Sequence, residues 1–190
     1  TYTFLWTEIN GTCTVSSPVT VNFYQMPIAN AGTGGNECDL NFNLRAVPGI
    51  GTGTWTKTSG PGTATFAPNA NSVNAEVTVS VYGTYVFTWT ETNGTCSSSA
   101  SVTVSFYQQP VANAGTGGNE CDLNFTLNAT PSVGSGTWTK TGGPGTVVFT
   151  SSVSSPSNVV TVSEYGTYTF TWTEVNGTCS SNASVTVNFY

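Results

Sequence analysis

Large aromatic side chains alternate with smaller residues at the start of the chain. In the segment Tyr2–Trp6, the residues Tyr, Phe and Trp occupy every second position, with threonine or leucine between them. Successive side chains of a strand point to opposite faces, so this alternation predicts a strand with one apolar face. Asn10 and Gly11 then favour a tight hairpin turn, because both tolerate positive φ. The return strand, Val15–Phe23, keeps the same two-residue period.

The same hairpin sequence occurs three times at a constant spacing. The copies are Thr1–Tyr24, Thr84–Tyr107 and Thr167–Tyr190, so the period is 83 residues and contains no insertion or deletion. A fixed period of this kind indicates a tandem array of structural units. We therefore predict the C-terminal hairpin of a truncated repeat at residues 1–24, and complete repeats at residues 25–107 and 108–190. The initial half repeat indicates that the native protein is longer than this segment.

Each complete repeat contains further strand patterns and no helical period. In the first repeat, Ile28–Ala31 is predicted to begin an edge strand, and the glycine-rich Gly32–Asn36 a loop. Clean alternation over Cys38–Ala46 predicts a second, half-buried strand, and a further strand is centred on Trp55. With two short strands before the hairpin, the count is about seven per repeat. This pattern predicts an all-β fold of tandem immunoglobulin-like β-sandwiches.

Composition excludes several classes of function. Three basic residues against nine acidic ones give a formal charge of −6, so no basic patch is available for nucleic acid. The segment has no histidine, which removes Ser–His–Asp, Cys–His and most zinc arrangements. We expect no catalytic residue and no cofactor here. No stretch approaches the roughly 20 apolar residues that span a bilayer, so we also expect no membrane span in this segment.

Two pairs of carboxylates are the main candidates for metal ligands. Glu37 with Asp39, and Glu120 with Asp122, lie at the start of the predicted second strand of each repeat. Oxygen ligands of this kind suit calcium, but solvated charge at one end of a domain is the simpler explanation. The glutamate before each hairpin turn, as at Glu8, could join such a site or keep the turn soluble.

The aromatic residues divide into core and junction candidates, each with a counterpart 83 residues later. Trp55 and Trp89 lie in the phase of core positions, and we predict that both are buried. Tyr24 falls in the opposite phase at the end of its hairpin, where it could pack at a junction between repeats or form a platform for sugar stacking. Tyr85 is placed for a tyrosine corner, with its hydroxyl on nearby backbone.

The five cysteines allow two plausible pairings. Cys13, Cys96 and Cys179 follow the hairpin turn, whereas Cys38 and Cys121 begin the predicted second strand. Pairing Cys38 with Cys96 and Cys121 with Cys179 would keep each disulfide within one repeat. Those cysteines could however lie at opposite ends of a sandwich, and a disulfide needs Cα atoms within about 7 Å. Pairing Cys38 with Cys179 would instead join consecutive repeats. Both pairings stay open, and we expect Cys13 to pair outside this segment.

Four short motifs carry a resemblance to known proteins. They are Pro110–Gly115 (PVANAG), Gly136–Thr139 (GTWT), Tyr165–Thr173 (YGTYTFTWT) and Asn176–Cys179 (NGTC). The chain resembles the PKD-like and Ig-like repeats of very large cell-surface proteins of gliding Bacteroidota, the SprB-like adhesin class exported by the type IX secretion system. The resemblance implies an extracellular β-sandwich array used as a filament, stalk or adhesin. The Asp/Gly-rich motif that precedes the third strand of ordinary PKD repeats is missing.

Two functional hypotheses follow. The first is a non-enzymatic segment of an extracellular, cell-surface filament or adhesin, an extended rod whose partners are neighbouring repeats of the same protein and, as further candidates, identical chains in a filament and surface polysaccharide. The alternative is an array of carbohydrate-binding modules, attached to a secreted hydrolase in one version. Coplanar aromatic rings exposed on one face would favour the alternative, whereas buried tryptophans would not.

Overall fold

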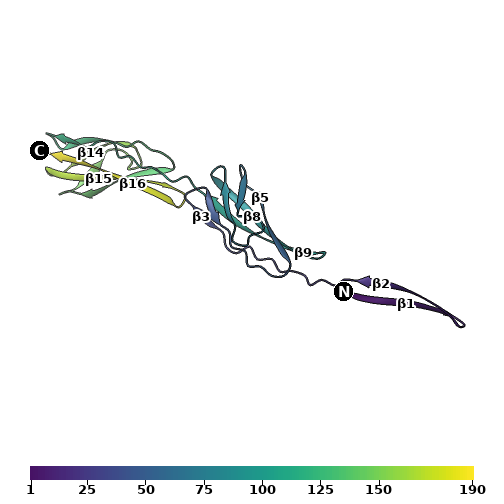
Figure 1. The fold of residues 1–190 in the computed structure, drawn as a ribbon. Helices are drawn as coiled ribbons and strands as arrows, with labels where there is room; N and C mark the ends of the chain where they lie inside the picture. Colours follow the sequence, from purple (N-terminus) through teal and green to yellow (C-terminus); the bar gives the residue numbers. More distant parts are fainter.

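The computed structural model describes all residues 1–190 and contains only strands, turns and irregular segments. Figure 1 shows a separate hairpin followed by two β-sandwiches, with the N-terminus at the base of the hairpin and the C-terminus at the far end of the second sandwich. The hairpin consists of β1 (Tyr2–Asn10) and β2 (Cys13–Val21), paired antiparallel. No helix is present that could cross a membrane.

The first sandwich consists of two facing sheets of four and three strands. Strand β3 pairs parallel with β9, and all other pairings are antiparallel. Its four-stranded sheet has the order β3 (Gly35–Glu37), β9 (Cys96–Phe106), β8 (Gly83–Asn93) and β5 (Thr52–Ser59). Its three-stranded sheet has the order β4 (Asn41–Asn43), β7 (Glu76–Val79) and β6 (Ala64–Ala67).

The second sandwich repeats this topology strand for strand. Strand β10 pairs parallel with β16, as β3 does with β9. The four-stranded sheet has the order β10 (Gly118–Glu120), β16 (Cys179–Phe189), β15 (Gly166–Asn176) and β12 (Ser135–Gly142). The three-stranded sheet has the order β11 (Asn124–Asn128), β14 (Ser157–Val162) and β13 (Val147–Phe149). The count of seven strands per sandwich agrees with the sequence prediction.

Each sandwich has its own aromatic core. Trp55 and Trp89 lie opposite each other on β5 and β8, with ring centroids 5.2 Å apart and almost no exposure. Gly53 lies under the Trp89 ring, because a Cβ there would be only 1.8 Å from Cζ2 of that ring. The predicted tyrosine corner is present: the Tyr85 hydroxyl donates to the Val81 carbonyl at 2.8 Å. The prediction that these tryptophans form the core is confirmed.

The outer face of the four-stranded sheet is covered by hydroxyl groups in place of charges. Cross-strand pairs between β8 and β9 include Thr88 with Ser101 at 2.8 Å and Thr90 with Ser99 at 3.0 Å. Cross-strand pairs of hydroxyl-bearing residues add a few tenths of a kcal/mol each, about 0.2–1 kcal/mol. The alternation of threonine with aromatic residues therefore gives each strand a dry inner face and a hydrogen-bonded outer face.

The start of each repeat differs from the sequence prediction. The glycine-rich segment predicted as a loop contains β3, and Ile28–Ala31 contributes only an isolated bridge between Asn30 and Val47. The cause is close backbone approach: a Cβ on Gly34 would lie 1.8 Å from the Thr103 carbonyl oxygen of β9. These glycines therefore bring the segment against its neighbour. Cys38 also lies before β4 and not within it.

Candidate functional site: the joint between the sandwiches

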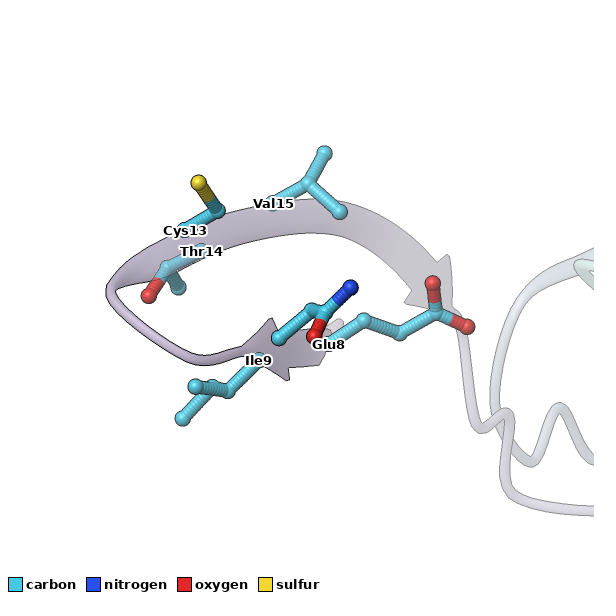
Figure 2. A pocket seen from close by; sticks show the side chains of 6 residues that line it. Glu8, Ile9, Cys13, Thr14 and Val15 are labelled. Atoms are coloured by element: carbon cyan, nitrogen blue, oxygen red, sulfur yellow. The ribbon is translucent and has the colours of Figure 1, made fainter.

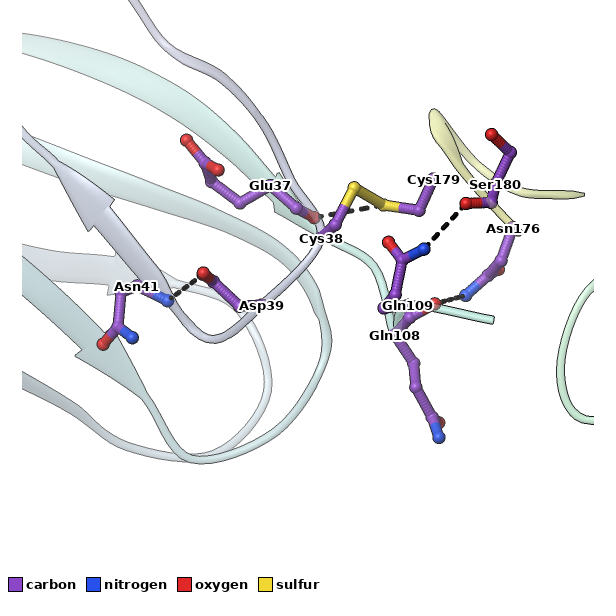
Figure 3. Close-up of a disulfide and its surroundings, with 9 residues drawn as sticks. All are labelled: Glu37, Cys38, Asp39, Asn41, Gln108, Gln109, Asn176, Cys179 and Ser180. Atoms are coloured by element: carbon purple, nitrogen blue, oxygen red, sulfur yellow. Dashed lines mark hydrogen bonds between the residues drawn. A yellow bond between two sulfur atoms is a disulfide. The ribbon is translucent and has the colours of Figure 1, made fainter. Parts of the chain in front are cut away.

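The two sandwiches are joined by a disulfide between Cys38 and Cys179. The two Cα atoms are 5.6 Å apart, although the cysteines are separated by 141 residues in sequence. Cys38 follows β3 of the first sandwich, and Cys179 is the first residue of β16 in the second. Figure 3 shows the bond crossing from one sandwich to the other. Of the two pairings that the sequence left open, the structure contains the one across the junction.

The linker between the sandwiches is held by hydrogen bonds from both sides, and Figure 3 shows those that join it to the second sandwich. The Asn176 side-chain amide donates to the Gln108 carbonyl at 2.8 Å, and the Gln109 amide donates to the Ser180 carbonyl at 2.7 Å. On the other side, the Tyr107 backbone N–H donates to the Glu37 carbonyl at 2.8 Å. Pro110, which follows Gln109, is buried. The linker is therefore part of the joint and not a free tether.

Tyr107 packs on the glycine of the hairpin turn in the following sandwich. Gly177 has φ of +61°, and a Cβ there would lie 2.4 Å from Cδ1 and Cε1 of the Tyr107 ring. Glycine is thus required twice, for the left-handed backbone of the turn and for the approach of the ring. Of the two roles that the sequence allowed for these tyrosines, Tyr107 therefore takes that of junction packing.

The base of the hairpin makes a second, partial copy of this joint. The Asn93 side-chain amide donates to the Gln25 carbonyl at 2.9 Å, and the Tyr24 ring covers Gly94, which has φ of +60°. Cys96 occupies the place of Cys179 but is a half-buried free thiol, 3.8 Å from the Tyr24 carbonyl oxygen. The asparagine hydrogen bond and the packing of the tyrosine on glycine are thus present at both positions, whereas the disulfide is present at one.

We expect Gly177→Ala to weaken the joint far more than Gly11→Ala. Both glycines have φ near +60°, so both substitutions cost about 1–2 kcal/mol of backbone strain. Gly11 has no atom within 4 Å of an added Cβ, whereas at Gly177 the Tyr107 ring must move away. Cys179 lies two residues after Gly177 and is 1% exposed, so a displaced turn is expected to open access to its sulfur. Dithiothreitol should therefore reduce the disulfide about tenfold faster in Gly177→Ala. Equal reduction rates in the two variants would contradict a packing role for Tyr107.

The carboxylates proposed as calcium ligands make local contacts. The Asp39 carboxylate accepts the Asn41 backbone N–H at 2.8 Å, and Asp122 accepts that of Asn124 at the same distance. Glu37 contributes its backbone carbonyl to the joint, 3.7 Å from Cys179 Sγ (Figure 3). No group of three or more acidic, cysteine or histidine side chains gathers anywhere in the chain. The pair Glu120 and Asp122 in the second repeat corresponds to Glu37 and Asp39 in the first. These contacts give Asp39 and Asp122 a role in turning the chain toward β4 and β11.

The glutamates before the hairpin turns are buried in both sandwiches, which sequence reasoning missed. Trp172 Nε1 donates to Glu174 Oε1 at 2.9 Å, and both the backbone N–H and the hydroxyl of Ser132 donate to Oε2. Burial alone would raise the pKa of Glu174, but these hydrogen bonds outweigh it and hold the pKa below its ordinary value. Glu91 makes the same bond to Trp89 Nε1, at 2.9 Å. The signal available in the sequence was the Trp-Thr-Glu triplet, which places both side chains on one face.

Similarity to known proteins is found at the level of structure. No protein-family model and no curated protein sequence matches the chain. The extracellular domains 3–5 of Drosophila OTK align with 99% of this chain and 70% of their own, at a TM-score of 0.59 and 10% identity. Immunoglobulin domains 1–4 of Sidekick-1 align with 97% of this chain and 57% of their own, at a TM-score of 0.50 and 12% identity.

A third solved structure is an endo-fucoidan hydrolase from glycoside hydrolase family 107. It covers 100% of this chain and 34% of its own, with 19% identity, but its TM-score of 0.30 is too low to carry weight. At such identities the likenesses concern the fold alone. Together with the two matching seven-stranded sandwiches, they show that the chain has the fold of tandem immunoglobulin-like β-sandwich repeats.

Proposed function

We propose that the chain is a non-enzymatic structural segment of an extracellular surface filament or adhesin. In this proposal the hairpin at residues 1–24 and the repeats at residues 25–107 and 108–190 are consecutive units of an extended rod that presents a binding end away from the cell. The resemblance to SprB-like repeats of gliding Bacteroidota favours this assignment. The primary partners are neighbouring repeats, with identical chains and surface polysaccharide as further candidates.

The disulfide joint is the observation that carries the proposal. Cys38–Cys179 fixes the distance between the sandwiches, and the hydrogen bonds of Asn176 and Gln109 fix the linker. The third kind of contact is the packing of Tyr107 on Gly177. A joint that combines these three contacts resists bending better than a flexible linker does. The disulfide also favours an oxidising compartment outside the cytosol. A surface rod needs both properties.

Small-angle X-ray scattering of the oxidised chain tests the proposal. Eleven-residue strands such as β8 are about 37 Å long, so two sandwiches and the hairpin in line should measure about 100 Å. The expected radius of gyration is about 30 Å, compared with about 16 Å for a compact globule of this length. A matched variant, Cys38→Ser with Cys179→Ser, should give a broader distribution of distances. A compact particle for the oxidised chain would contradict the rod.

The carbohydrate-binding alternative receives less support. Trp55, Trp89 and their counterparts in the second sandwich are buried, so they offer no surface for a sugar ring. The rings of Tyr24 and Tyr107 pack against Gly94 and Gly177, the glycines of the hairpin turns that follow them. Exposed aromatic rings share one face only on β1, at Tyr2, Phe4 and Trp6. The matching residues of both sandwiches are buried in the core, so this exposed face is not a feature of a complete repeat.

A further inference from the structure

The hairpin presents an apolar face whose counterparts are buried in both sandwiches. Tyr2, Phe4 and Trp6 are 61%, 53% and 69% exposed, whereas the matching Tyr85, Phe87 and Trp89 are at most 1% exposed. The arrangement on the hairpin is already that of a core, because Tyr2 meets Phe23 edge to face at 5.4 Å, as Tyr85 meets Phe106 at 5.5 Å. The face therefore lacks only the strands that would cover it.

The tip of the hairpin lacks a second covering segment. Figure 2 shows a hollow there, lined by Glu8, Ile9, Asn10, Cys13, Thr14 and Val15. In the second sandwich the residue matching Glu8 is Glu174, which is covered by Ser132 and its neighbours in the segment before β12. At Glu8, the hollow thus corresponds to the place of that segment in a complete repeat.

The edge of the hairpin and the Cys96 thiol lack the same partner. In the first sandwich, β3 pairs parallel with β9, and its last residue is followed by Cys38. The matching edge of β2 has no such strand. Next to this edge, Cys96 has the Tyr24 and Gln25 contacts of the complete joint but no cysteine opposite it.

We propose that these surfaces form one binding site for a polypeptide segment of the same sequence type as Gln25–Gly83. The segment would cover the apolar face of the hairpin, pair along β2 as β3 does along β9, and place its cysteine against Cys96. The proposal deepens the proposed function, on which it rests for the presence of further repeats. The site is continuous with the partial joint at Cys96. Its support is the match of that arrangement to the complete joint, which the chain contains once with every part in place.

The covalent step is a thiol–disulfide exchange. The Cys96 thiol and the incoming cysteine thiol each give up a proton, and together they transfer two electrons to a small-molecule disulfide such as oxidised glutathione. The sulfur–sulfur bond of glutathione breaks, two glutathione thiols leave, and a bond forms between Cys96 Sγ and the incoming Sγ. Cys121, exposed at the far end, has the position of Cys38 and would serve a following repeat in the same way.

The new bond would interlock with the existing one. Cys38 lies between the incoming cysteine and Cys96 in sequence, so the loop closed by the new disulfide overlaps the loop closed by Cys38–Cys179. Overlapping loops cannot be pulled apart one after another as separate beads can. A run of such repeats would thus be covalently continuous through its joints, with the short Cys13–Cys38 and Cys96–Cys121 segments each connecting every second disulfide.

The test uses the whole chain, lengthened by a copy of Gln25–Gly83 directly before Thr1 and refolded with oxidised and reduced glutathione. We expect peptide mapping under non-reducing conditions to join Cys96 to the added cysteine. Alkylation of Cys96 by iodoacetamide should be lost, and emission from Trp6 should shift to shorter wavelength as the ring is buried. In a control, Cys38→Ser in the added copy should leave Trp6 buried and restore alkylation of Cys96.

Three results would overturn the proposal. The first is a Cys96 thiol that reacts as fast in the lengthened chain as in the original chain. The second is Trp6 emission unchanged in both lengthened chains, which would show that the hairpin face does not take the segment. The third is a disulfide from Cys96 to Cys121 of another molecule. A bridged but compact chain would instead overturn the rod while leaving this inference intact.

Discussion

Stretching the oxidised chain from its two ends should release far less length than stretching the reduced chain. The covalent path runs from Thr1 to Cys38, across the disulfide, and from Cys179 to Tyr190. The residues between the two cysteines carry no tension once the disulfide is taut. Because a chain extends by about 3.3–3.6 Å per residue, the 141-residue separation corresponds to about 500 Å of hidden length.

Single-molecule force spectroscopy with handles at both termini measures this difference directly. In the oxidised chain, total extension should stop at about 180 Å, the length of the chain outside the bridge. Adding dithiothreitol under load should release the remaining length of about 500 Å in later steps. The double variant Cys38→Ser with Cys179→Ser should behave as the reduced chain does under all conditions. Equal extensions with and without reductant would show that Cys38 and Cys179 are not joined.

A disulfide in this position changes how load passes through the molecule. A bridge within one sandwich would protect that sandwich alone and leave the linker as the weakest element. The observed bridge carries load past most of both sandwiches, including β8 and β15 at their centres. Unfolding of either core then adds no length between the ends. Such a joint suits a surface rod that is pulled from its tip.

Much of the fold could be predicted because alternation and repetition are local signals. The alternation over Tyr85–Trp89 predicts which face of the strand is buried, and Asn93 with Gly94 predicts where the strand turns back. The parallel strand β3 was missed because its glycines resemble those of a loop. Glycine is needed there because Gly34 lies against the Thr103 carbonyl, and that carbonyl belongs to a strand about 70 residues further on.

The joint was only partly predictable, for the same reason. Sequence alone limited the cysteines to two pairings, but the choice depends on which ends of two sandwiches meet. The role of Asn176 was hidden, because Asn-Gly is already explained by the turn it forms. Only the structure shows that its amide also holds Gln108. Burial of Glu174 was hidden because a glutamate is usually exposed.

Replacement of Glu174 by alanine should destabilise the second sandwich strongly, whereas Glu8→Ala should have almost no effect. The two residues occupy the same place in the repeat, but Glu174 is 1% exposed and Glu8 lies on the exposed hairpin. Removing the Glu174 carboxylate leaves Trp172 Nε1 and the Ser132 N–H buried without an acceptor. At about 1–3 kcal/mol for each unpaired group, the loss should reach about 3 kcal/mol or more. Amide hydrogen exchange should show it in β15 and β16, with β8 and β9 as the unchanged reference.

The same carboxylate should make the second sandwich sensitive to acid. The pKa of Glu174 in the folded chain lies below the ordinary value of 4.5, because its hydrogen bonds outweigh the effect of burial. The unfolded chain therefore binds a proton more readily, so this stabilisation is complete above pH 4.5 and is lost as the pH falls through the folded pKa. Glu174→Gln should remove this dependence while keeping the shape of the side chain. If exchange in β15 showed the same slope with pH in both proteins, Glu174 would not be ionised in the folded state.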